Sequence, residues 1–131
     1  MATRSLVTVF PANPNDEALH QGSIRILKWT GLTNASSDVG AVLGTDYAGY
    51  TDRSVQVFGT FGTGGTCTIQ GSLDGTNWAT LNDPQGNALT VQAAKIEALL
   101  EAVPYLRPNI TAGDGTTNLD CWIFLRQNRM G

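Results

Sequence analysis

Few residues in this chain could carry out acid–base, nucleophilic or metal chemistry. His20 is the only histidine, and Cys67 and Cys121 are the only cysteines. Three such residues cannot supply the four nitrogen or sulfur ligands of a structural zinc site. A Ser-His-Asp triad would have to use His20, and no nucleophile-elbow sequence accompanies it. We therefore expect a protein that is not an enzyme and that holds no metal and no cofactor.

Oxygen-bearing side chains and glycines gather where turns are predicted. The run at residues 59–65 has no lysine after its glycines and opens no helix, so it indicates a turn and not a phosphate-binding loop. No pair of carboxylates stands out for acid–base catalysis. Calcium stays an alternative at five side chains whose spacing matches no recognised calcium loop, although Asp and Asn favour turns for conformational reasons. These are Asp74, Asn77, Asp83, Asp114 and Asp120.

Aromatic side chains point to contacts with a partner. In residues 118–127, Trp122 and Phe124 alternate with apolar residues and should lie on the opposite face of a strand. Exposed aromatic patches usually mark interfaces, so a subunit contact is one interpretation. Two others remain open. Both faces of the strand could be covered within the fold, or Trp29, Trp78 or Trp122 could form a platform for a sugar.

The elements that would position these residues are strands. Period-two alternation in residues 53–61 and 66–72, on both sides of a turn at Gly62–Gly65, predicts an antiparallel hairpin with one buried face. Asp74-Gly75 predicts a second tight turn into a third short strand at residues 77–81. The three segments together predict a β-meander.

Further strands are predicted at residues 4–10, 23–29, 88–92, 105–112 and 118–127. Pro108 suggests that its strand lies at a sheet edge. Cys67 and Cys121 fall on predicted inward faces, where buried free thiols are common, and a disulfide between them is the alternative if their strands face each other. Residues 93–103 place Ile96, Leu99, Leu100 and Val103 on one stripe, which predicts a helix.

These elements predict an all-β fold, an antiparallel β-sandwich or jelly roll of seven or eight short strands with one short helix. The length of 131 residues fits a single domain over residues 1–131. The Pro-rich segment 11–22 should be a loop or projecting arm. Residues 31–52 should form a long loop, with a partial strand over Gly40–Leu43 as the alternative.

The composition excludes some partners. The net charge is −3 and the eight Lys and Arg residues are scattered, so we expect no nucleic-acid binding and no attachment to anionic membranes. No apolar run approaches the ~20 residues that span a bilayer, and no secretory signal opens the chain. We therefore expect synthesis in a cytosol.

Residues 53–126 resemble a family of small tailed-bacteriophage virion proteins, the capsid cement or decoration proteins. The segment GSLDGTNWATL, followed later by RPNITAGDGTT, carries most of the likeness, whereas residues 1–52 hold no matching motif. The resemblance implies a protein made in the host bacterial cytoplasm and found in the virion, on the capsid exterior. It would bind the outer surface of an HK97-like capsid and stabilise it by bridging major capsid protein subunits.

The partners implied are the phage major capsid protein and further copies of the chain, as a homodimer or homotrimer. The residues predicted to form these interfaces are Phe10, Pro11, Tyr47, Tyr50, Trp122 and Phe124. Two alternatives are a lectin-like or receptor-binding virion module and a head–tail or tail structural component.

Overall fold

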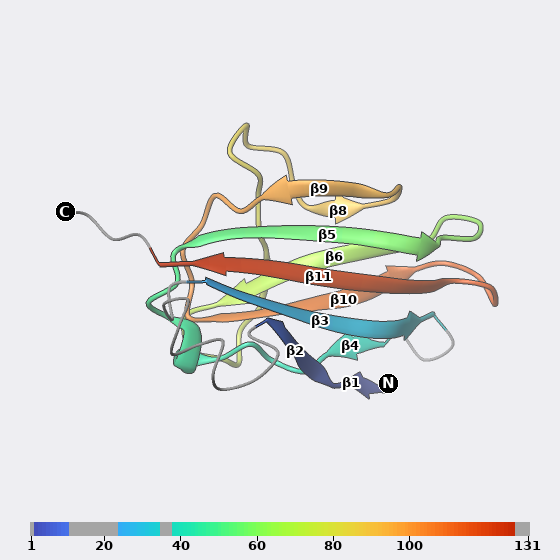
Figure 1. The fold of residues 1–131 in the computed structure, drawn as a ribbon. Helices are drawn as coiled ribbons and strands as arrows, with labels where there is room; N and C mark the ends of the chain where they lie inside the picture. Colours follow the sequence, from blue (N-terminus) through green and yellow to red (C-terminus); the bar gives the residue numbers. More distant parts are fainter. Residues whose placement is uncertain (1, 11–23, 35–37, 128–131) are drawn as a thin grey trace.

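Two β-sheets packed face to face form the described part of the chain, which is residues 2–10, 24–34 and 38–127 of the computed structural model (Figure 1). Sheet A has the order β1-β4-β10-β6-β7, with β8 also paired to β6, and sheet B has the order β2-β3-β11-β5-β9. The strands of sheet A are β1 (Thr3–Arg4), β4 (Val39–Gly40), β6 (Thr66–Ser72), β7 (Ala79–Thr80), β8 (Thr90–Val91) and β10 (Tyr105–Ala112). Those of sheet B are β2 (Leu6–Phe10), β3 (Ile24–Thr33), β5 (Asp52–Thr60), β9 (Lys95–Ala98) and β11 (Asn118–Arg126).

The predicted all-β sandwich is confirmed. The described residues form seven strands of four or more residues and four strands of two residues. All pairs are antiparallel except β1 with β4, which is parallel. No helix in the described part of the chain is long and apolar enough to cross a membrane.

Strand β11 lies at the centre of sheet B, between β3 and β5. Its alternation is as predicted, because Leu119, Cys121, Ile123 and Leu125 are fully buried while Trp122 and Phe124 are partly exposed on the other face. A strand with partners on both sides and one side of its sheet against the core shows the cleanest period of two.

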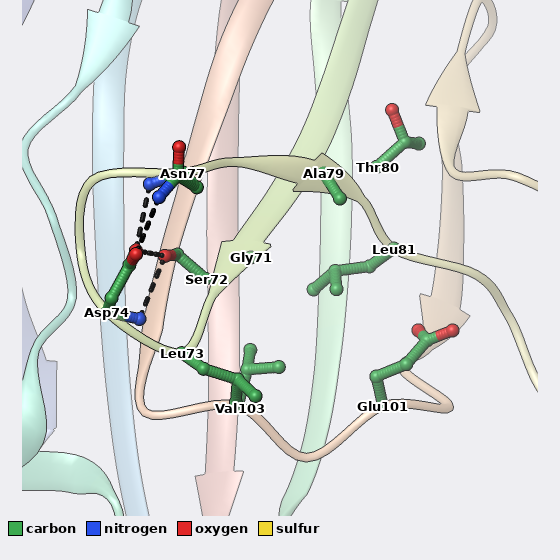
Figure 2. Close-up of a pocket in the computed structure, with 10 residues that line it drawn as sticks. All are labelled: Gly71, Ser72, Leu73, Asp74, Asn77, Ala79, Thr80, Leu81, Glu101 and Val103. Atoms are coloured by element: carbon green, nitrogen blue, oxygen red, sulfur yellow. Dashed lines mark hydrogen bonds between the residues drawn. The ribbon is translucent and has the colours of Figure 1, made fainter.

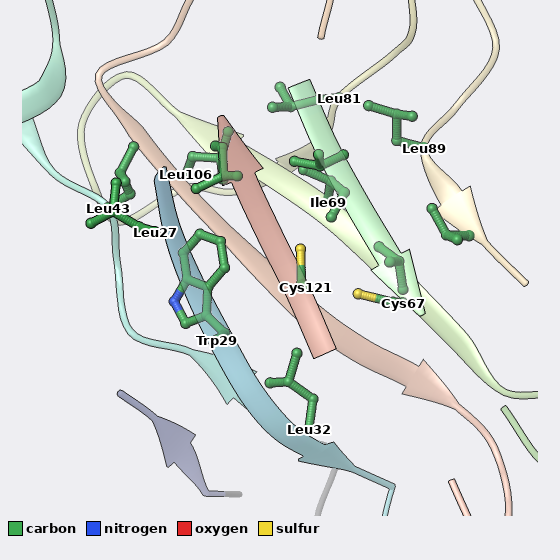
Figure 3. Packing of buried hydrophobic residues seen from close by; sticks show 14 of the residues in the cluster. Leu27, Trp29, Leu32, Leu43, Cys67, Ile69, Leu81, Leu89, Leu106 and Cys121 are labelled. Atoms are coloured by element: carbon green, nitrogen blue, oxygen red, sulfur yellow. The ribbon is translucent and has the colours of Figure 1, made fainter. Parts of the chain in front are cut away.

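The core lies between the two sheets and draws side chains from both (Figure 3). Trp29 is its largest fully buried side chain, and the indole N–H donates a hydrogen bond to the carbonyl oxygen of Ala41 at 2.8 Å. Leu106 and Ile69 enter from sheet A, and Leu27 enters from sheet B. The single polar group of this buried side chain is therefore satisfied.

The predicted hairpin of residues 53–61 and 66–72 is wrong in its pairing. Strand β5 belongs to sheet B and β6 to sheet A, so the turn at Gly62–Gly65 carries the chain from one sheet to the other. Both strands do bury the predicted faces, with Val55, Val57, Cys67 and Ile69 in the core. The third strand of the meander is confirmed, since β7 pairs with β6.

The helix predicted over residues 93–103 is wrong. Residues Lys95–Ala98 form strand β9 along the edge of β5, and Ile96 and Leu100 are exposed while Leu99 packs against the core. A short helix that ends at Pro104 would be only marginally stable on its own. The edge of β5 instead offers backbone hydrogen-bonding groups, and four residues of β9 pair with it. The described helical residues are instead one 3-10 turn, η1 (Thr45–Tyr47).

The long loop predicted over residues 31–52 is also wrong within its described part. Strand β3 continues to Thr33, β4 adds a pairing at Val39–Gly40, and Leu43 forms an isolated bridge with Leu106. Val39, Leu43 and Tyr50 are buried. Residues 31–33 therefore belong to sheet B, and residues 39–43 contribute to sheet A and to the core.

Two further predictions, on the first strand and on the position of β10, differ from the structure. The first predicted strand is divided between the sheets, because β1 joins sheet A and β2 joins sheet B. Strand β10 is not at an edge as Pro108 suggested, since it lies between β4 and β6. The arm predicted at residues 11–22 lies outside the described residues.

Candidate functional site: the outer face of sheet B

The outer face of sheet B carries two rows of side chains that run across the strands. One row joins Val7, Lys28, Trp122, Gln56 and Ile96 through successive strand pairs. Directly paired residues in antiparallel strands point to the same side of the sheet, so these five side chains face outward together.

The second row joins Phe10, Ile26, Phe124, Ser54 and Ala98. Phe10 reaches this row because a β-bulge between Thr8 and Phe10 shifts the register of β2. The fold thus brings together Phe10, Trp122 and Phe124, three of the six predicted interface residues. We call the two rows, together with Phe58, the aromatic face.

Trp122 is the centre of this face. Its ring centroid lies 6.2 Å from that of Phe58 in a tilted arrangement, and the ammonium group of Lys28 lies 5.3 Å from its ring centroid. A cation over an indole ring is favourable by about 0.5–1 kcal/mol at an exposed site. The indole N–H of Trp122 is buried and has no hydrogen-bond acceptor among the described residues.

A shallow cavity of about 240 Å³ opens beside Trp122 and is lined by Ile26, Gln56, Ile96 and Phe124 among others. The two edges of the sheet continue the apolar surface, since Val7 is 45% exposed and Ile96 is 63% exposed. Half-exposed apolar side chains gathered on one face of a sheet are typical of a contact with a partner.

The outer face of sheet A is different in character. It pairs Arg107 with Gln70, whose side chains share a hydrogen bond of 2.9 Å, and the Thr68 and Thr111 hydroxyls lie 3.0 Å apart. The Arg107 guanidinium lies over the ring of Trp78, 4.2 Å from its centroid, and burial lowers the pKa of this arginine. These polar groups of sheet A have partners within the chain, whereas the aromatic face of sheet B is largely apolar.

The other predicted interface residues lie elsewhere. Tyr50 is only 7% exposed and belongs to the core, and Tyr47 packs against it with ring centroids 5.9 Å apart. Both are therefore left out of the aromatic face. Pro11 lies outside the described residues. Among the predicted sugar-platform residues, Trp29 is buried in the core, so only Trp78 and Trp122 are partly exposed.

Sequence reasoning missed the contribution of Lys28, Gln56 and Ile96 to this face. Lys28 lies in a strand whose alternation was recognised, but only the cross-strand register puts it beside Trp122. Ile96 was assigned to a helix, and only its pairing with Gln56 turns it outward on sheet B. Register between distant segments is not written in local periodicity.

A second hollow of about 450 Å³ lies beside β7 and is floored by Leu81, Val103 and Ala79 (Figure 2). The two carboxylates at its rim, those of Asp74 and Glu101, both accept hydrogen bonds from the backbone. Asp74 accepts hydrogen bonds from the backbone N–H groups of Asn77 and Thr76 at 2.8 Å, and these bonds lower its pKa. Glu101 accepts from the N–H of Asn82 at 2.8 Å, which likewise lowers its pKa.

These carboxylates therefore stabilise the turns and loops in which their hydrogen-bond donors lie. The same holds for Asp114, whose pKa is lowered first by the N–H of Thr63 at 2.8 Å and then by Thr116. Within the described ranges, no group of three or more His, Cys, Asp or Glu side chains lies close enough to hold a metal ion.

Comparison with known proteins adds little to this description. No family model matches the chain, and no curated protein matches it. Among solved structures, the chain is similar to the crystal structure of FeII HppE, with 12% identity, 81% of this chain covered and a TM-score of 0.38. The match covers 44% of that chain, so the present chain spans less than half of its length.

Proposed function

We propose that this protein is a bacteriophage capsid cement or decoration protein that binds the outer surface of an HK97-like capsid and bridges major capsid protein subunits. The likeness of residues 53–126 to that family is the reason for this choice of partner. The aromatic face is the structural observation that carries the proposal, because it offers a half-exposed, largely apolar surface on a sheet whose central strand is paired on both sides.

The aromatic face would bind by shape and burial. Trp122 and Phe124 supply large apolar surfaces held by strand partners on both sides, so little side-chain freedom is lost on binding. Aromatic residues near the centre of an interface commonly contribute 2 kcal/mol or more to binding.

The test is co-sedimentation of the purified protein with bare capsids of the phage that encodes it, followed by heating of the particles. We expect saturable binding and a higher temperature of capsid disruption. Trp122→Ala with Phe124→Ala should weaken binding by at least tenfold, in line with about 1.4 kcal/mol or more lost.

Trp78→Ala is the matched control, because it removes a partly exposed tryptophan from the other side of the molecule. It should leave capsid binding unchanged. Full-strength binding by the Trp122/Phe124 variant would exclude the aromatic face as the contact. Absence of the protein from the capsid shell of purified virions, or its presence only at the tail, would overturn the cement function.

A further inference from the structure

Cys67 and Cys121 lie on opposite sheets and meet in the core. Cys67 is in β6 between Ile110 and Val91, and Cys121 is in β11 between Val57 and Trp29. Neither has another cysteine beside it in its own sheet, and both are fully buried free thiols. Figure 3 shows both sulfur atoms in the same part of the core, between the two sheets, and the neighbouring Cys67 thiol raises the pKa of Cys121.

This placement has the features of a site for an inter-sheet disulfide. The thiols come from the central part of each sheet, where strands on both sides hold the backbone in place. Trp29 is paired with Cys121 and packs in the same layer. A buried disulfide that joins the two sheets beside a core tryptophan is an arrangement that β-sandwiches tolerate well.

We propose that Cys67 and Cys121 are an oxidative cross-linking site, and that a low-molecular-weight disulfide such as oxidised glutathione converts them to an intramolecular disulfide joining the sheets. One thiolate attacks the reagent and releases one reduced thiol. The second protein thiolate then attacks the resulting mixed disulfide and releases a second reduced thiol. The protein loses two hydrogens and one reagent disulfide becomes two thiols, so atoms and electrons balance.

The same burial makes the reaction slow in the folded protein. The contact with Cys67 and the burial both raise the pKa of Cys121, so little of the reactive thiolate is present at neutral pH. A mixed disulfide with glutathione has no room in the core. Oxidation must therefore pass through transient opening or occur during folding, and the pair stays reduced in a reducing compartment.

The experiment uses the full chain, refolded in parallel in reduced and in oxidised glutathione buffers. We expect the oxidised product to be a monomer that is 2 Da lighter, with no thiol detectable under denaturing conditions and one cross-linked Cys67–Cys121 peptide. The bond would close a loop of about 55 residues, so the oxidised protein should melt at a temperature roughly 10 °C above that of the reduced protein.

The Cys67→Ser and Cys121→Ser variants are the controls, since each keeps one thiol and neither can form the bond. They should show no mass loss of 2 Da and no redox-dependent shift in melting temperature. The inference is overturned if both thiols survive refolding in oxidised glutathione, if only intermolecular disulfides form, or if the oxidised monomer melts at or below the temperature of the reduced one.

This inference does not depend on the proposed function, because every readout comes from the isolated chain. If the protein is a capsid cement, the bond would close once a particle leaves the reducing host cytosol. Capsid binding by the reduced protein tests the first proposal and disulfide formation in free solution tests the second, so either can fail alone.

Discussion

Asp38 links Arg4 in β1 to Thr33 at the end of β3 through one carboxylate oxygen. The Oδ2 atom accepts hydrogen bonds from the guanidinium Nε of Arg4 at 2.8 Å and from the backbone N–H and hydroxyl of Thr33, both at 2.9 Å. The residue is 1% exposed. Burial alone would raise the pKa of Asp38, but the hydrogen bonds from Thr33 and Arg4 outweigh it and the pKa is lowered.

A lowered pKa means that Asp38 stabilises the fold when it is ionised. This contribution is complete above the unfolded-state pKa, near 4, and is lost as the pH falls through the lower folded-state pKa. We expect Asp38→Asn to reduce the free energy of unfolding by about 2 kcal/mol at pH 7, since the partly exposed Arg4 keeps the loss below that of a fully buried ion pair.

Urea denaturation of both proteins at pH 7 and near pH 2.5 checks this prediction. The difference between them should shrink at the lower pH, where the native carboxylate begins to protonate. A difference of the same size at both pH values would mean that the charge of Asp38 contributes nothing and that only the local packing has changed.

Arg53 shows a second way to bury a charge. Its guanidinium has no acidic partner among the hydrogen bonds of the described residues and instead donates to three backbone carbonyls. These belong to Tyr50 at 2.7 Å, Tyr47 at 2.8 Å and Val103 at 2.9 Å. Burial lowers the pKa of Arg53, yet an arginine stays charged. This one side chain therefore fixes the turn that buries Tyr50.

At the scale of elements, β4 and β10 fit together through one glycine and one proline. The N–H of Leu106 bonds to Leu43 and that of Ile110 bonds to the carbonyl of Asp38, so the position between them, Pro108, faces Gly40. A Cβ added to Gly40 would lie 2.6 Å from Cδ of Pro108 and 2.6 Å from Cδ1 of Trp29. Because Gly40 has no side chain, there is room beside it for the ring of Pro108, which has no N–H to donate to β4.

Gly40→Ala should therefore destabilise the protein by about 1–3 kcal/mol through overpacking. Gly44→Ala is the matched control, because nothing lies within 4 Å of its added Cβ and its φ of −108° suits alanine. Thermal denaturation of the three proteins compares them directly. Equal melting temperatures for Gly40→Ala and the wild type would show that β4 can move away from Pro108 without loss.

The sequence predicted those elements whose signal is local. The alternation of β11 and the turn at Asp74-Gly75 depend on neighbouring residues alone, and both are found. Pairing was not predictable in this way. The turn at Gly62–Gly65 looks the same whether the next strand returns to its own sheet or crosses to the other.

The errors in β9 and in Tyr50 have the same origin. The apolar stripe of residues 93–103 suits a helix, and only the free edge of β5 selects a strand there. Tyr50 was predicted as an interface residue within a long loop, but the hydrogen bonds of Arg53 hold that segment against the core. Of the candidate site, the outward faces of Trp122 and Phe124 were predictable and the partners beside them were not.

At the scale of the whole molecule, the chain passes repeatedly between the two sheets. In chain order, β1 lies in sheet A, β2 and β3 in sheet B, and β4 in sheet A again. Later, β9 lies in sheet B, β10 in sheet A and β11 in sheet B (Figure 1). The strands that pair are often distant in sequence, as β3 and β11 are. One apolar cluster serves both sheets, so neither has a core of its own.

This arrangement predicts that the protein unfolds as one cooperative unit. In urea, the tryptophan fluorescence, to which the buried Trp29 contributes together with Trp78 and Trp122, and the far-ultraviolet circular dichroism, which reports strand content, should change with the same midpoint and slope. Refolding should take milliseconds to seconds or longer, because distant strands must pair before the core can close. Two separated transitions would show that one sheet persists without the other, and the shared core would then not be what holds the two sheets together.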